Sequence, residues 1–89
     1  MKRARIIVSG DVQGVAYRHH AKKLADQLNL TGWVRNEPNG DVYIIVEGDI
    51  AAVDKFVKWS RSGSPMAEVE ETDISDEKYT GGEPPFEVR

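Results

Sequence analysis

Alternating apolar and polar residues at the start of the chain predict a β-strand. Within residues 3–9, Ala4, Ile6 and Val8 share one face, and the other face is mostly polar. A period of two residues is typical of a strand with one buried face. A turn-like segment with two glycines, residues 10–17, follows this strand.

The next pattern is helical. Within residues 18–29 four apolar side chains recur at spacings of three and four, which places them on one stripe: Ala21, Leu24, Ala25 and Leu28. A second stripe of Val53, Phe56 and Val57 predicts another helix, with Asp49 as its N-cap and Gly63 and Pro65 ending it.

Two strands are predicted between the helices. Residues 31–36 form the first, and residues 41–47 return after the turn at 38–40, where Asn-Gly supplies a positive φ. The returning strand is expected to turn three side chains inward: Val42, Ile44 and Val46.

The last third of the chain predicts a strand with an irregularity. Within residues 67–75, Val69 and Ile74 are five positions apart, so they share a face only if a β-bulge lies between them. Residues 79–85 form a loose segment rich in glycine and proline, and residues 86–89 are expected to add a short fifth strand.

The order of elements is therefore β-α-β-β-α-β with a possible fifth strand. This order predicts an α+β, ferredoxin-like sandwich in which both helices cover one face of an antiparallel sheet. With 89 residues the chain is expected to form a single domain, residues 1–89. The fold alone does not define a function.

Composition and charge argue against some classes of function. The net charge is -3 and the pI is about 5.3, which argues against nucleic-acid binding. Residues 1–45 nevertheless hold seven basic and four acidic residues, so an anion site is expected in that half. The chain has no cysteine, no long apolar stretch and no export signal, so we expect a cytoplasmic protein without disulfides or membrane contact.

The segment from Gly10 to Arg18 is the main candidate for chemistry. Two glycines let the main chain curl, and the N–H groups of such a loop and of the following helix can hold an anion. The guanidinium of Arg18 matches a phosphate or carboxylate group. The alternative is that the glycines only make a turn and Arg18 is a solvated helix start.

Two other features have competing interpretations. Asn36 lies at a strand end before a hairpin, where it can orient a water molecule or simply support the turn, and the spacing alone favours the turn. His19 and His20 are adjacent on a helix and point about 100° apart, so they do not favour a shared metal site. Six acids within residues 68–77 favour a charged edge strand over a catalytic carboxylate pair.

Two motifs resemble the signatures of the acylphosphatase family. The run from Val8 to Arg18, Val-Ser-Gly-Asp-Val-Gln-Gly-Val-Ala-Tyr-Arg, resembles the first signature. Gly32-Trp-Val-Arg-Asn36, followed by Gly40, Val42 and Gly48, resembles the second. Residues 63–65 and the closing residues 86–89 also resemble family features, so the likeness extends over essentially the whole chain.

The resemblance implies hydrolysis of acyl phosphates to a carboxylate and inorganic phosphate, without a metal or cofactor. It implies that Arg18 binds the phosphate and that Asn36 positions the water. It also implies that main-chain N–H groups form a phosphate cup, from Gly14, Val15, Ala16, Tyr17 and Arg18. The expected partner is a small acyl phosphate, and a monomer is the default state.

Asp11 departs from the family pattern, since many members carry a basic residue at this variable position. A carboxylate there is expected to weaken substrate affinity unless it points away. Two other functions stay open. An RNA-binding module would use aromatic residues on the central strands, but residues 41–47 offer only Tyr43. A non-catalytic acyl-phosphate-binding domain would lie within a larger protein, whereas a chain that begins at Met1 and stops after its closing strand favours a stand-alone enzyme.

Overall fold

The computed structural model describes residues 1–89 and contains five strands and two helices. Their order is β1 (Lys2–Asp11), α1 (Tyr17–Gln27), β2 (Thr31–Asn36), β3 (Val42–Gly48), α2 (Ile50–Ser60), β4 (Glu68–Glu77) and β5 (Glu87–Val88). This order confirms the predicted β-α-β-β-α-β sequence and the short closing strand.

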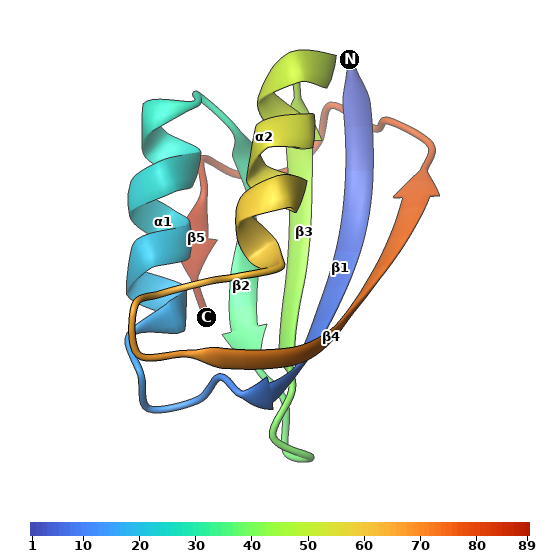
Figure 1. Cartoon of the computed structure of the whole chain (residues 1–89). Helices are drawn as coiled ribbons and strands as arrows, with labels where there is room; N and C mark the ends of the chain where they lie inside the picture. The colour runs from blue at the N-terminus through green and yellow to red at the C-terminus, as the bar shows by residue number, and fades with distance from the viewer.

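The strands form one sheet in the order β4-β1-β3-β2-β5. The pairs of β1 with β3 and β4, and of β2 with β3, are antiparallel, whereas β5 runs parallel to β2. Both helices lie on one face of this sheet (Figure 1). The α+β, ferredoxin-like fold is therefore confirmed, with a mixed sheet because of the parallel β5.

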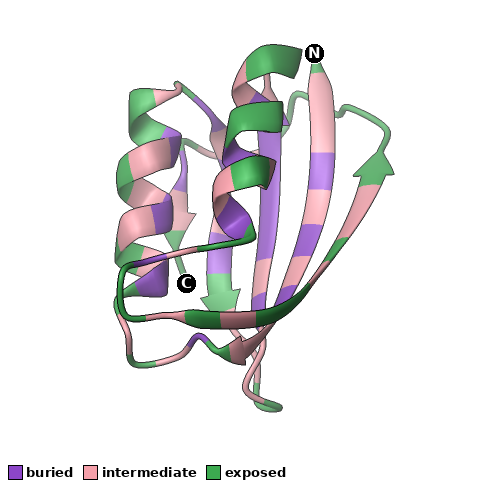
Figure 2. Cartoon of the chain, viewed as in Figure 1, coloured by how far each residue is buried: buried purple, intermediate pink, exposed green.

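The core lies between the sheet and the helices, and its buried residues on both layers are purple in Figure 2. All the side chains predicted to point inward from the first and third strands are fully buried: Ala4, Ile6, Val8, Val42, Ile44 and Val46. The opposite face of β3 is also covered in part, because Ile45 and Glu47 are buried there. The alternation in the sequence did not predict this second covered region.

The predicted irregularity in β4 is a β-bulge. Ser9 pairs with Glu71 and Gly10 pairs with Val69, which leaves Glu70 without a partner on β1. The extra residue brings Val69 and Ile74 onto the same face, and both pack against the core. The bulge is confirmed, and it explains the five-residue spacing.

The helix boundaries differ slightly from those predicted. α1 begins at Tyr17 and is followed by Asn29 in the left-handed region, where the N–H of Leu30 donates to the Ala25 carbonyl. Asp49 occupies the N-cap of α2, but its side chain makes no capping hydrogen bond. No helix in the structure is both long and apolar enough to cross a membrane.

Candidate active site

A hollow of about 300 Å³ lies where the β1–α1 loop meets the end of β2. Its lining comes from three separate parts of the sequence: Val12, Gly14, Ala16, Tyr17, Arg18, His19, Asn36 and Val88. The hollow therefore brings together Arg18, Asn36 and most of the predicted cup. Val15 is the exception, since its side chain packs against the core instead.

The loop before α1 leaves a run of main-chain donors free. Gly14 and Ala16 both adopt left-handed conformations, with φ of 73° and 63°, so the main chain curls here. The helix starts without a side-chain cap, and its first main-chain hydrogen bond runs from the His20 N–H to the Ala16 carbonyl. The N–H groups of residues 14–19 consequently donate to no acceptor within the chain. Such a run is suited to an anion.

The guanidinium of Arg18 is partly engaged at the edge of the hollow. Its Nη1 donates to the main-chain oxygen of Arg89 at 3.0 Å. Arg89 follows β5, and its own N–H donates to the Val34 carbonyl of β2 at 2.8 Å. The end of the chain thus holds one nitrogen of Arg18 and leaves the other guanidinium donors for a ligand.

Asn36 is the last residue of β2, where it pairs with Val42 of β3. Its amide lines the hollow, and the side-chain oxygen Oδ1 is buried without any hydrogen-bond partner. An unpaired buried acceptor costs about 1–3 kcal/mol, so such groups are few, and Oγ1 of Thr72 on β4 is the other buried side-chain atom without a partner in this structure. The sequence pattern alone favoured a turn-supporting role, which this unpaired oxygen does not indicate.

Two side chains for which the sequence predicted no role fix the loop around the hollow. Gln13 donates through Nε2 to the Glu37 and Asp41 carbonyls at 2.8 and 2.9 Å, which ties the cup to the β2–β3 hairpin. Ser64 is buried and donates through Oγ to the Val15 carbonyl at 2.7 Å. The only sequence signal was the family-like position of residue 64, which implied no role.

Tyr17 anchors the start of α1. Its hydroxyl donates to the Ser60 carbonyl of α2 at 2.9 Å, and burial raises the pKa of this phenol. Gly63 has a φ of 69°, and a Cβ at this position would collide with the Tyr17 ring. Residues 60–64 therefore contact Tyr17 and position the N-terminus of α1.

The remaining candidates lie around the site. Asp11 is exposed at the end of β1 and does not line the hollow. His19 lines it, whereas the Nδ1 atom of His20 lies 2.9 Å from the Ala16 carbonyl. The two imidazole rings meet edge to face, and no group of three or more His, Cys, Asp or Glu side chains is arranged to hold a metal ion.

The comparisons with known proteins agree with this geometry. The acylphosphatase family model matches residues 4–88. The chain belongs to the acylphosphatase family. An acylphosphatase from Rubrobacter xylanophilus is 46% identical over 88 residues, covering 99% of this chain and 80% of that protein. The crystal structure of acylphosphatase from Bacillus subtilis has a TM-score of 0.95 at 36% identity and covers 100% of this chain and 99% of its own.

A third relative, the acylphosphatase of Methylococcus capsulatus, is 47% identical over 81 residues, which is 91% of this chain and 88% of that protein. Acylphosphatases are hydrolases, so this chain is an enzyme of that class and acts on acyl phosphates. The family assignment favours this function over an RNA-binding module and over a binding domain without catalysis.

Proposed function

We propose that the chain hydrolyses acyl phosphates by in-line attack of a water molecule on a phosphoryl group held in the cup of residues 14–19. The observation that carries the proposal is the free run of main-chain N–H groups beside Arg18 in one hollow. Those donors and the guanidinium bind the three phosphoryl oxygens, where negative charge lies in a loose transition state.

The reaction needs no general acid at the leaving group. The bond from phosphorus to the carboxylate oxygen breaks, and the carboxylate departs with the electron pair. The acid that corresponds to this leaving group has a pKa of about 4, so it leaves without being protonated. The products are a free carboxylate and inorganic phosphate.

Asn36 orients the attacking water in this mechanism. We assign this role to its carboxamide group, which hydrogen-bonds the water at the edge of the hollow and places the water oxygen opposite the leaving group. An amide does not take up a proton, so the water's proton passes to a phosphoryl oxygen of the substrate. No metal or cofactor enters the reaction, and neither histidine is required as a base.

Hydrolysis of benzoyl phosphate, followed by its ultraviolet absorbance with EDTA present, tests this mechanism. Arg18→Ala is expected to lower kcat/KM by roughly 1,000-fold, and Asn36→Ala is expected to lower kcat by roughly 100-fold. Arg61→Ala and Gln27→Ala are matched controls, because both residues are exposed and lie outside the hollow. Circular dichroism checks that each variant is folded.

The outcomes separate the parts of the proposal. Loss of turnover in both site variants but in neither control supports the assigned roles. Turnover that survives Arg18→Ala would place the reaction elsewhere, and turnover abolished by His19→Ala in a folded protein would restore a side-chain base. An intact protein that binds phosphate but does not hydrolyse benzoyl phosphate would contradict the mechanism.

A further inference from the structure

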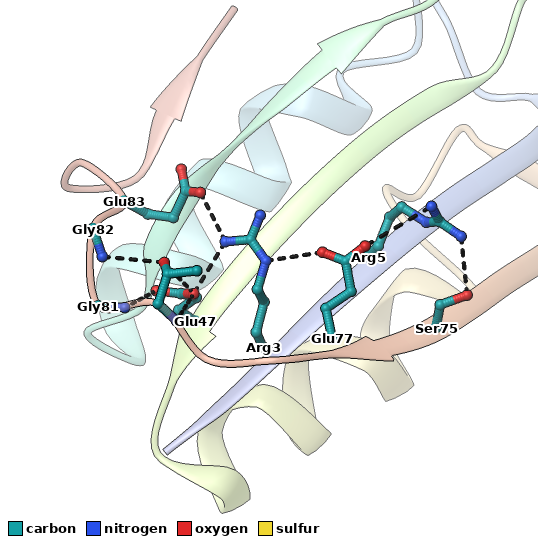
Figure 3. Close-up of polar contacts among 9 residues, drawn as sticks. Arg3, Arg5, Glu47, Ser75, Glu77, Gly81, Gly82 and Glu83 are labelled. Atoms are coloured by element: carbon teal, nitrogen blue, oxygen red, sulfur yellow. Dashed lines mark hydrogen bonds and ion pairs between the residues drawn. The ribbon is translucent and has the colours of Figure 1, made fainter.

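A carboxylate is fully buried at the end of the sheet opposite the cup. Glu47 of β3 has no solvent exposure, and four donors surround it (Figure 3). The Thr80 N–H and hydroxyl each donate to its Oε2 at 2.9 Å, the Gly81 N–H donates to Oε1 at 3.0 Å, and Nη1 of Arg3 donates to Oε2 at 3.0 Å.

Glu47 cannot touch a substrate in the hollow. It pairs with Thr31 at the start of β2, whereas Asn36 ends the same strand. Five residues of extended chain span about 17 Å, so the carboxylate acts on the reaction only through other parts of the molecule.

Three of the four donors to Glu47 belong to the segment between β4 and β5, residues 78–86, which we call the strap. Figure 1 shows the strap crossing behind the sheet from β4 to β5. Glu83 of the strap accepts from the same Arg3 nitrogen at 2.8 Å, and the Pro84 carbonyl accepts from the Gly32 N–H at 2.9 Å. The strap then ends in Phe86, which is buried in the core.

The strap delivers a strand that completes the active site. β5 is only two residues long, and Val88 within it lines the hollow while remaining 45% exposed. Arg89 directly follows, and its main-chain oxygen holds the guanidinium of Arg18. A strand of two residues contributes few ladder hydrogen bonds, so its placement depends on the segment that leads into it.

We propose that Glu47 is a positioning residue of the active site, which clamps the strap so that β5 holds Arg18 in its phosphate-binding orientation. The inference rests on the proposed role of Arg18. A clamped strap leaves Arg18 preorganised for the phosphoryl group, whereas a loosened strap lets the guanidinium sample other orientations before it binds. Substrate and inorganic phosphate both depend on that orientation, so both lose affinity together.

Glu47→Gln is the direct test. The donors around Glu47 use both oxygens of its carboxylate, whereas the amide of glutamine offers only one acceptor oxygen. At least one strap contact is therefore lost. KM for benzoyl phosphate and the inhibition constant of inorganic phosphate are both expected to rise on the order of tenfold, with kcat changed much less. Thr80→Val, at an exposed residue, removes the hydroxyl that donates to Glu47 and accepts from the Gly82 N–H, and it is expected to give a smaller rise of the same kind.

A merely structural role gives a different result. Destabilisation reduces the fraction of folded enzyme, which lowers the apparent kcat and leaves KM unchanged. Ile74→Ala provides this reference, because Ile74 packs against the core from β4, at the edge of the sheet farthest from β5.

The result separates this inference from the proposed mechanism. Raised KM and raised phosphate inhibition constant in both strap variants, with KM unchanged in Ile74→Ala, support the clamp. If wild-type enzyme turns over and is inhibited by phosphate, but Glu47→Gln and Thr80→Val keep its KM, the clamp is wrong and the mechanism stands. If Glu47→Gln does not fold, Thr80→Val decides by the same criterion. If the wild type itself fails to hydrolyse the substrate, the mechanism is wrong, and phosphate affinity of the variants, measured by calorimetry, still tests the clamp.

Discussion

The two ends of the sheet contain nearly the same set of hydrogen-bond donors and differ in the anion they surround. Around Glu47, two main-chain N–H groups, one hydroxyl and the guanidinium of Arg3 enclose a carboxylate that belongs to the chain. Around the hollow, the main-chain N–H groups of residues 14–19 donate to no acceptor within the chain, and Arg18 uses only one guanidinium nitrogen, for the main-chain oxygen of Arg89. The first set is complete on folding, whereas the second is left open for the anion that we propose it binds.

The difference shows how one set of donors serves structure or function. Burial alone would raise the pKa of Glu47, but the Thr80 N–H, Arg3 and the other donors outweigh it, so its pKa is lowered. Burial likewise disfavours the charge on Arg3, yet hydrogen bonds from Arg3 to Glu83, Glu77 and Glu47 raise its pKa. A charge network satisfied from within stabilises the fold, and donors left unsatisfied create affinity for an external anion.

The strongest test of this contrast is a variant that places a carboxylate of the chain itself in the cup. Ala16→Asp places a carboxylate at the N-cap of α1, where residues of this type tolerate the left-handed conformation. We expect kcat/KM to fall roughly 1,000-fold because the carboxylate competes with the phosphoryl group. The free energy of unfolding is expected to rise by about 0.5 kcal/mol, since a negative charge is favourable at a helix N-terminus.

Ala16→Asn is the matched control for that experiment. The asparagine side chain has nearly the same shape as aspartate but carries no charge, so this variant should retain most of the activity. Kinetics with benzoyl phosphate and urea unfolding measure both effects. Equal losses of activity in the Asp and Asn variants would mean that the shape of the loop matters and that charge does not.

Acid should break the hydrogen-bond network around Glu47 before the rest of the fold is lost. The folded pKa of Glu47 lies below its unfolded value of about 4.3, so the folded state binds fewer protons and this stabilisation is full above that value. It disappears as the pH falls through the folded pKa. Glu47→Gln is expected to cost about 3 kcal/mol at pH 7 and less at lower pH. Urea unfolding from pH 7 to pH 3 measures this, and a difference independent of pH would contradict it.

A smaller effect is expected from loosening the cup without changing its charge. Ser64→Ala removes the hydrogen bond to the Val15 carbonyl, which costs about 1 kcal/mol and frees the loop that carries the donors. The inhibition constant of phosphate should rise as a result. Ser62→Ala is the control, because Ser62 is exposed and donates only to the Trp59 carbonyl of α2. The two variants should differ in thermal unfolding and in phosphate inhibition.

The smallest effect concerns charge outside both networks. Asp11 is exposed near the hollow, so Asp11→Arg should lower KM about twofold at low salt and have no effect at high salt. Asp11→Asn should lower KM in the same direction, by about half as much when the change in KM is expressed as a free energy. A KM that stays the same or rises in Asp11→Arg at low salt would exclude a contribution of this charge.

Much of the fold could be predicted because its signals are local. The alternation at Ala4, Ile6 and Val8 defines the buried face of β1, and the five-residue spacing of Val69 and Ile74 indicated the bulge. The candidate residues Arg18 and Asn36 stand out in their motifs, and their roles stay predictions. That they share one hollow follows from the topology, which brings the start of α1 and the end of β2 to the same edge.

The complete network around Glu47 could not be predicted, and the reason is physical. By alternation with Val46, Glu47 belongs to the face without helices, where a charged residue is expected to meet solvent. Its burial depends on Thr80 and Gly81, more than 30 residues further along in a segment that looked loose. Gln13 was missed for a related reason, since its acceptors are main-chain carbonyls, which no side-chain pattern reveals.

The free N–H groups of the cup belong to the main chain, so side-chain substitutions over generations do not remove them. Substituting Val15 or His19 with any residue other than proline leaves their N–H groups in place, so drift at these positions does not delete a donor. What selection must preserve is the path of the chain, above all the left-handed turns at Gly14 and Ala16. Inherited variation can therefore reshape the surroundings of the hollow while its main-chain N–H donors persist.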